Sequence, residues 1–501
     1  MNISFKYIAP FVFGASLVML GCGHSVPADS KYVDSLANVY PCYDGAAIPC
    51  NIAPLDFDIE IEDEADEYLT RIYSDKSEIL VEGSFVDIPE SDWNSMLNES
   101  KGDSLHIGIY EKHGDEWRRY RTMSVFVSPD TIDRYLVYRL IEPSYVTFEG
   151  LRIEQRDLTS FDTKTVYDNM AMSTGDNGQC VNCHSFQNYN AGGNMQMHFR
   201  VANGGTLVMH GDNIRKVNFM SGSAISTGVY PSWHPTKNLI AYSLNETGQN
   251  FHTRDIQKVE VLDYASDVIL YDADKDVSTY VAHDSLEFET FPYWNHDGTK
   301  LYYCSAHFKF NTDDVDTEMA DRYKEVKYNI LSRDFNPDTN TFGQVDTVFN
   351  AASFGKSATF PRESPDGRYL LFTMADFGNF HIWHKSADLY VKDLRTGNVR
   401  PLREVNSNDV ESYHSWSSNG RWIVFSSRRD DGSYTRPYIA WFDSKGNAHK
   451  PFVLPQGKSG FYKKLYKSFN IPEFIVSPVV LSSRAMAEVL KGEADVVPLN
   501  E

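Results

Sequence analysis

The 501-residue chain is poor in positive charge, and this limits what it binds. It has 47 Lys and Arg against 69 Asp and Glu, a formal net charge of -22. Such an acidic chain argues against nucleic acid as a partner and against a polybasic membrane contact. After the N-terminal segment, no apolar run reaches the length of about 20 residues that a membrane span needs.

Several catalytic signatures are absent as well. The sequence contains no G-x-S-x-G elbow, no P-loop and no H-E-x-x-H motif. Hydrolases and NTPases of those classes are therefore unsupported. A single C-x-x-C pair occurs, whereas a structural zinc site wants further Cys or His ligands at a short spacing.

Cysteine is scarce, with six residues, and that single pair lies in a C-x-x-C-H motif. Two thiols at this spacing can each add to a vinyl group of a porphyrin, and the following histidine then lies under the iron. We therefore predict one covalent haem c held by Cys180 and Cys183, with His184 as the proximal metal ligand. The alternatives are a thioredoxin-like redox pair, for which no βαβ pattern is present, half of a zinc site, or a chance occurrence of the motif.

A second axial ligand is expected shortly after the motif. Met195, Met197 and His198 lie there, and Met and His are the usual choices. We favour His198 or Met195 as the further metal ligand. Met197, a histidine of the later repeats, an open position and simple core packing are the alternatives. Arg200 could pair with a haem propionate, although a surface ion pair is the simpler interpretation.

The N-terminus has the pattern of an export signal. Lys6 is the only charged side chain of the first twenty-odd residues, and an apolar run follows at 7–20. This run is too short for a membrane span and fits a signal peptide, residues 1–21. Residues 19–22 resemble a bacterial lipoprotein box, with Met19 and Leu20 departing from its commonest residues. The resemblance implies lipidation of Cys22.

Export would place the other cysteines in an oxidising compartment. Cys42 and Cys50 bracket residues 43–49 and could close a small disulfide loop, the alternative being two free thiols. Cys304 follows an apolar run, so we expect it to be a buried small hydrophobe.

The composition and patterning predict an all-β fold. Aromatic residues make up 14% of the chain, which favours strands. Residues 22–54 are expected to form a tether interrupted by prolines. Short alternating stretches at 55–170 predict a β-sandwich-like domain, and residues 171–200 are the predicted c-type haem-binding segment.

From residue 201 to 455 the chain repeats a strand, a tight turn and a strand. The repeats begin at Tyr230, Phe291, Phe360 and Tyr413, and three of the four turns contain Asp-Gly or Asn-Gly. Such repeats predict a β-propeller with five or six blades, the alternative being unrelated hairpins in a large sandwich. The tail, residues 456–501, has a predicted helix at 482–491 and is expected to pack on the propeller.

These repeats resemble the PD40 repeats of TolB-like propellers. The whole chain resembles a family of lipoproteins from Bacteroides-type bacteria, often labelled TolB-like or cytochrome c biosynthesis proteins. The segments that carry this resemblance are 180–186, 195–198, 382–384, 411–416, 427–432 and 470–474. The resemblance implies a propeller and a haem, but no settled activity.

Three functions fit these predictions. We expect a lipid-anchored cytochrome for electron transfer or redox sensing, with a protein partner docked on the propeller face and the propeller shielding one haem face. A propeller scaffold for protein or glycan with structural haem is the second, and a haem enzyme the third, for which His381, His384 and His414 are candidates. We expect the protein to be located in the bacterial cell envelope. It should face the periplasm, because no acidic run follows Cys22.

Overall fold

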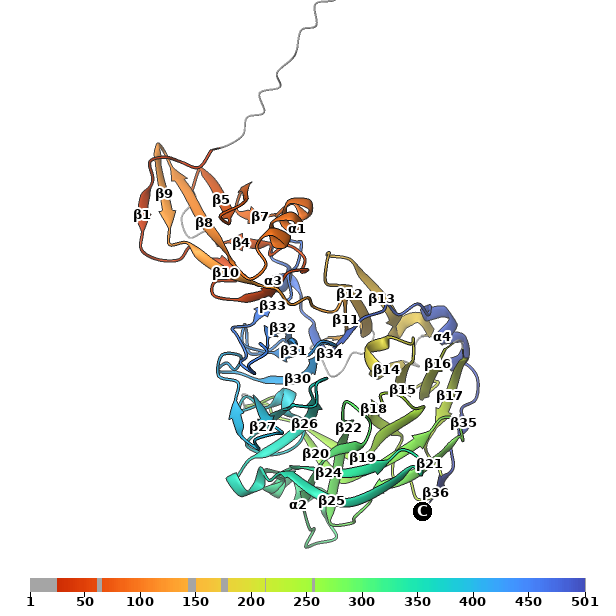
Figure 1. Cartoon of the computed structure of the whole chain (residues 1–501). Coiled ribbons are helices and arrows are strands. Elements are labelled where there is room, and N and C mark those ends of the chain that lie inside the picture. Colours follow the sequence, from red (N-terminus) through yellow and green to blue (C-terminus); the bar gives the residue numbers. More distant parts are fainter. Residues whose placement is uncertain are drawn as a thin grey trace, which may run out of the picture.

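The computed structural model describes residues 25–60, 65–142, 150–172, 179–211, 213–254 and 257–500. The predicted signal peptide and Cys22 lie outside the described residues. The described strands form an N-terminal β-domain and a propeller, so the expected all-β class is confirmed. Figure 1 shows the N-terminal domain, in red and orange, at one side of the propeller. None of the described helices has the length and apolar character of a membrane span.

The N-terminal domain contains a seven-stranded sheet, a three-stranded sheet and one helix. The larger sheet has the order β1-β9-β8-β10-β3, with β5 and β6 added beside β8, and the smaller has the order β2-β4-β7. The bounds are β1 Lys31–Val33, β2 Val39–Tyr40, β3 Ala47–Pro49, β4 Phe57–Ile59, β5 Glu67–Tyr73, β6 Glu78–Glu82, β7 Phe85–Val86, α1 Glu90–Glu99, β8 Ser104–His113, β9 Glu116–Tyr120 and β10 Met123–Ser128.

Four blades of the propeller follow one another along the chain after the first. The blade that carries the C-x-x-C-H motif contains β14 Gln179–Phe186, β15 Met195–Val201, β16 Gly205–His210 and β17 Asn213–Asn218. The next two contain β18 Gly228–Trp233, β19 Leu239–Phe251, β20 Val259–Asp272 and β21 Val277–Ala282, then β22 Glu287–Trp294, β23 Lys300–His307, β24 Asn329–Asn336 and β25 Thr341–Phe349. Then come β26 Ser357–Glu363, β27 Tyr369–Ala375, β28 Asp388–Asp393 and β29 Val399–Pro401, and β30 Glu411–Trp416, β31 Trp422–Ser427, β32 Arg436–Trp441 and β33 Phe452–Val453.

The sixth blade joins distant parts of the chain. Its strand order is β13-β12-β11-β34, formed by β11 Tyr135–Ile141, β12 Arg152–Asp157, β13 Thr163–Asp168 and β34 Ser468–Ile475. Figure 1 shows β34, in blue, beside β11. The inner strands β14, β18, β22, β26, β30 and β34 each contact the next, and β34 contacts β14, so the ring closes with six blades.

A bulge interrupts the inner strand of each blade. In five blades the residue at the bulge has a positive φ, which is uncommon for a residue with a side chain. These residues are Tyr230, Phe291, Phe360, Tyr413 and Ile471. Their four aromatic rings follow one another around the centre at 4.2 to 4.8 Å between centroids, so packing offsets the backbone strain.

The C-terminal tail wraps the outside of the propeller. The helix α4 Ser483–Leu490 begins after Ser482, whose hydroxyl accepts from the backbone N–H of Ala485. After it, β35 Asp495–Val496 pairs with β17, and β36 Leu499–Asn500 pairs with β21. Two further helices, α2 Val315–Arg322 and α3 Phe461–Lys464, lie in loops of the propeller.

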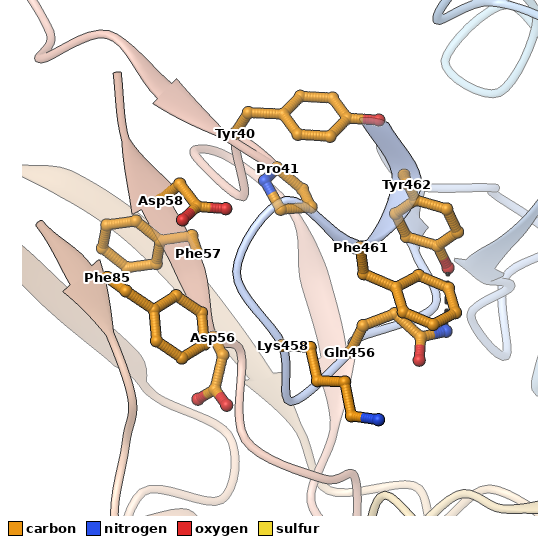
Figure 2. Close-up of a pocket in the computed structure, with 10 residues that line it drawn as sticks. All are labelled: Tyr40, Pro41, Asp56, Phe57, Asp58, Phe85, Gln456, Lys458, Phe461 and Tyr462. Atoms are coloured by element: carbon orange, nitrogen blue, oxygen red, sulfur yellow. Dashed lines mark hydrogen bonds between the residues drawn. The ribbon is translucent and has the colours of Figure 1, made fainter. Parts of the chain in front are cut away.

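One hydrophobic core runs from the N-terminal domain into the blade of β30–β33. At this junction the indole N–H of Trp441 donates to the Asp130 carboxylate at 3.0 Å. A second contact of the two units borders a small cavity, and Figure 2 shows Phe57 and Phe85 of the domain on one side of it and Phe461 and Tyr462 on the other. The volume of this cavity is about 10 Å³. A volume of about 10 to 15 Å³ holds one water, so the two units are closely packed.

The predicted domain boundaries need correction. The strands β11, β12 and β13 belong to the propeller, although residues 55–170 were expected to form the first domain. The described part of the predicted segment 171–200 contributes β14 and β15 to a blade instead of forming a separate segment. The expected tether at 22–54 already contributes β1 to β3. The propeller therefore extends from β11 to β34, because the ring closes between strands that are far apart in sequence.

Candidate functional site

The C-x-x-C-H motif lies on β14, the innermost strand of its blade. This strand pairs with β15 so that Cys180 lies opposite Arg200 and His184 opposite Met197. The register shifts between Val181 and His184, which places the strand's bulge within the motif. The motif is therefore at the centre of the propeller, in a strand and not in a surface loop.

His184 is held in an unusual state by its surroundings. Its side chain is 3% exposed, and both ring nitrogens are buried without a hydrogen-bond partner among the described residues. Burial, helped by the charge of Arg139, lowers the pKa of His184 to about 3. The backbone of Ile471 opposes this shift but makes no hydrogen bond of normal geometry. The imidazole is thus neutral, the form that binds metals.

The two thiols of the motif are free and have different surroundings. Cys180 is half-buried, with its Sγ 3.8 Å from Nη2 of Arg139, which also donates from Nε to the Val181 carbonyl at 3.0 Å. Cys183 is 4% exposed, and its burial raises the pKa of the thiol. Arg200 is exposed, and its guanidinium lies 3.1 Å from the side-chain amide of Asn182.

The expected second ligands lie on opposite faces of β15. Met195 and Met197 belong to the apolar core shared with Phe186, on the face of Val181. His198 has the other orientation, because its Nδ1 lies 3.0 Å from the hydroxyl of Thr206 and its Nε2 3.4 Å from that of Thr227. The strand period of two separates them, and Met197 is the residue directly opposite His184.

The repeat histidines are also buried, in separate places. His381 bonds through its ring to Thr359 and to the Gly378 carbonyl, and Nε2 of His384 lies 3.2 Å from the Glu260 carboxylate. His414 borders the central cavity, and its buried Nε2 has no hydrogen-bond partner within the described chain. The residues that the structure describes contain no group of three or more His, Cys, Asp or Glu arranged to hold a metal ion.

The centre of the propeller contains a partly open cavity of about 310 Å³. All six inner strands contribute to its wall, mainly through residues at or after the bulges. One representative from each strand is His184, Ser232, Tyr293, Arg362, Ser415 and Glu473. His184 therefore shares one space with residues of every blade, a juxtaposition that no local sequence pattern predicts.

The charged groups of the cavity differ in how they are paired. The Glu363 carboxylate accepts hydrogen bonds from the Tyr302 hydroxyl and from Nδ1 of His296, each at 2.6 Å. Arg362 and Glu473, by contrast, form no ion pair within the described part of the chain. Burial raises the pKa of Glu473 to about 8, against the opposing charge of Arg362.

The other cysteines differ from the disulfide expectation. Cys42 is exposed, whereas Cys50 is buried with its thiol facing the carbonyl of Pro129 at 3.6 Å, and both are free. The structure therefore contains free thiols where a disulfide was expected, because the side chains face different surroundings. Cys304 is fully buried, as expected, and burial raises its pKa.

No family model matches the chain, and no curated protein matches it in sequence. Among solved structures, oligogalacturonate lyase from Vibrio parahaemolyticus is 11% identical, with a TM-score of 0.32 over 59% of this chain and 85% of that chain. The β-propeller domain of the trilobed protease from Pyrococcus furiosus is 11% identical, with a TM-score of 0.33 over 71% and 95%. Prolyl oligopeptidase B from Galerina marginata is 11% identical, with a TM-score of 0.37 over 78% of this chain and 54% of that chain. These likenesses concern the fold alone.

Proposed function

We propose that this protein is a lipid-anchored c-type cytochrome built into a TolB-like propeller, acting in electron transfer or redox sensing with a docked protein partner. One haem c would be bound by Cys180 and Cys183, with His184 as the proximal ligand. The observation that carries the proposal is the His184 imidazole, which borders the central cavity with both ring nitrogens buried and without a hydrogen-bond partner among the residues that the structure describes.

An orphaned buried imidazole is costly without a ligand. Leaving a buried polar group without a hydrogen bond costs about 1 to 3 kcal/mol. A metal at one ring nitrogen would remove part of this cost, and the neutral ring requires no deprotonation first. When bound, the haem supplies one-electron chemistry at its iron. The two free thiols and the imidazole of the motif therefore fit a c-type haem.

The burial of the motif sets an order of events. Cys183 is 4% exposed in the closed propeller, and the backbone of Ile471 on β34 lies beside His184. Attachment of a porphyrin to this thiol would therefore precede the closure of the ring by β34. Arg139, which contacts Cys180, belongs to the neighbouring β11 and would join the site in the same closing step.

The candidates for the second axial ligand differ in their positions on β15 and in their present contacts. Met197 lies opposite His184 in the strand register, and Met195 is on the same face. His198 would have to leave its contacts with Thr206 and Thr227. A methionine ligand would raise the reduction potential, as in cytochromes c, and would suit electron transfer.

The test is an absorption spectrum of the full protein, exported from a host that matures cytochromes c. Haem bands that survive acid-acetone extraction, and that are lost in a C180S/C183S variant, are the expected result. A low-spin spectrum would support electron transfer, and a high-spin spectrum would favour an open, reactive site. Absence of haem bands from such a host would overturn the haem proposal.

The envelope location has its own test. Lipidation of Cys22 would anchor the protein in the bacterial envelope, facing the periplasm. Replacement of Cys22 by Ser should release the protein from the membrane fraction, and protease added to intact cells should leave the wild-type protein uncut. Cleavage of the wild type by that protease would indicate the cell surface.

The central cavity supports a second candidate, a propeller scaffold that binds a ligand or a partner. Its volume of about 310 Å³ is at the lower end of the range of small-molecule sites, about 300 to 1,000 Å³. In that case a haem would be structural, and ligand binding would persist in haem-free protein.

A further inference from the structure

The central cavity contains a cation with unused hydrogen-bond donors. Arg362 follows the bulge of β26, and its guanidinium lies 4.6 Å from the ring centre of Tyr293, over its face. Its single hydrogen bond in the described structure runs from Nη1 to the Pro361 carbonyl at 2.9 Å. A guanidinium has five N–H donors. Most of the Arg362 donors are therefore available to bind a ligand in the cavity.

The acidic groups nearby do not neutralise Arg362. Glu363 is occupied by His296 and Tyr302, as described above. Glu473 is within electrostatic reach, but it makes no ion pair with Arg362 within the described chain. The raised pKa of Glu473, about 8, keeps this carboxyl largely protonated at neutral pH. The Arg362 guanidinium is therefore a cation of the cavity wall that no carboxylate of the described chain pairs with.

The guanidinium is enclosed, yet it faces the cavity. Arg362 has intermediate exposure because it borders the cavity, while protein surrounds it and burial lowers its pKa. Its backbone is fixed from the neighbouring blade, since the Trp416 indole donates to the Arg362 carbonyl at 3.0 Å. A buried cation without a counter-ion is costly, and an anion entering the cavity would offset that cost.

We propose that the central cavity binds a carboxylate-bearing ligand, with Arg362 as the anion-binding residue. Guanidinium and carboxylate match as a two-pronged, charge-assisted pair. The guanidinium lies over the Tyr293 ring, and the Glu473 carboxyl borders the same cavity. The carboxylate can come from a diffusible small organic acid or from a haem propionate. The site itself consists of propeller residues and needs no haem.

Binding is tested by titration calorimetry on the full protein in its haem-free C180S/C183S form. The probes are glucuronate and succinate, with glucose as the neutral control. The expected result is that the acids bind and glucose does not, and that R362Q weakens binding by about tenfold or more. R368Q is the matched control, because Arg368 is on the same blade but pairs with Asp393 outside the cavity.

Two further measurements keep the result decisive. R362K retains the charge and should fold if R362Q does not, yet it should still bind the acids about tenfold more weakly, because Lys lacks the planar fork. In haem-loaded protein, a propionate in the site would block glucuronate, and R362Q would shift the haem reduction potential. The proposal is wrong if neither acid binds haem-free protein and R362Q leaves the haem potential unchanged. A haem-free wild type that binds the acids would support this site and contradict only the cytochrome.

Discussion

Trp416 donates its indole N–H to the backbone carbonyl of Arg362 at 3.0 Å, and this bond joins the inner strands β30 and β26 of neighbouring blades. The indole is 2% exposed and also packs edge-on against Phe442. The position of the cavity cation therefore depends on a residue that belongs to another repeat.

Trp416→Phe removes this bond while it keeps most of the buried aromatic surface. We expect a loss of about 1 kcal/mol in the free energy of unfolding, the usual net worth of a hydrogen bond, and weaker binding of glucuronate. Urea denaturation and calorimetry measure the two effects. Trp441→Phe is the control, because its indole bonds to Asp130 at 3.0 Å at the domain junction. Equal loss of glucuronate binding in both variants would contradict a positioning role for Trp416.

Gly367 has no room for a side chain because His296 lies beside it. Its φ is +67°, and a Cβ there would lie 2.3 Å from Cε1 of His296. Gly397 has a similar φ of +75° but nothing within 4 Å of the added Cβ. Gly397→Ala should therefore cost only backbone strain, about 1 to 2 kcal/mol.

Gly367→Ala should cost more, because it also displaces His296 from Glu363. The Glu363 carboxylate would then lack its hydrogen bond from His296 and could compete for the Arg362 guanidinium, which should weaken the binding of carboxylate probes. Thermal unfolding and calorimetry on the two alanine variants provide the comparison. Equal melting temperatures for G367A and G397A would show that His296 moves at no cost.

The sequence predicts the blades whose strands follow one another closely along the chain. The turns at Asp297-Gly298, Asp366-Gly367 and Asn419-Gly420 lie between inner and second strands, as the hairpin chemistry predicts. The aromatic residues that lead the repeats, such as Tyr230 and Phe360, are the bulge residues at the propeller centre. The pattern thus predicted four blades correctly, and the predicted total of five or six blades includes the observed six.

The remaining blades lack a complete local signal. In the motif blade, Asn182 and Cys183 stand at the bulge instead of an aromatic residue and proline. The closing blade combines β34 with strands from the start of the propeller, which no periodicity reveals. Ile471-Pro472 was a usable sign of a further inner strand, since proline also follows the bulge residue at Pro231 and Pro361.

Only the part of the candidate site that lies on β14 could be predicted from the sequence. The motif identified His184, but the ring of blades brings Arg362 and Glu473 into the same cavity. The choice of His198 or Met195 ahead of Met197 did not use the strand period, because the segment was not predicted to be a strand. A charged residue at position 362, where other repeats have Ser232 and Ser415, was the available signal for a cavity function.

Asp263 predicts a measurable pH dependence of stability. Its carboxylate is 3% exposed, accepts from the Tyr328 hydroxyl at 2.5 Å and from the Asn379 amide, and lies near the acidic Glu260. Burial raises its pKa from 3.8 to about 7. The folded state then binds a proton more tightly than the unfolded state does, so its contribution to stability is lost as the pH rises from about 4 to about 7.

Asp263→Asn should flatten this dependence. The difference in pKa corresponds to roughly 4 kcal/mol at most. Urea denaturation at about pH 3 and at about pH 8, beyond the two ends of this range, measures the change in stability in both proteins. Asp56, Glu289 and Glu473, whose pKa values are also raised by burial, should leave a residual slope in the variant. An identical pH dependence in the wild type and D263N would contradict the assignment to Asp263.

His184 and His198 offer the sharpest contrast, because they are equally buried but differently bonded. In haem-free protein, His184→Phe removes two unpartnered ring nitrogens, so the free energy of unfolding should stay unchanged or rise. His198→Phe instead leaves the hydroxyls of Thr206 and Thr227 without their partner and should cost about 1 to 3 kcal/mol. In haem-loaded protein the order should reverse for the absorption spectrum, since H184F removes the proximal ligand and H198F does not. Strong destabilisation of haem-free protein by H184F would mean that His184 has a structural role. It would contradict the proposal that His184 is a metal ligand.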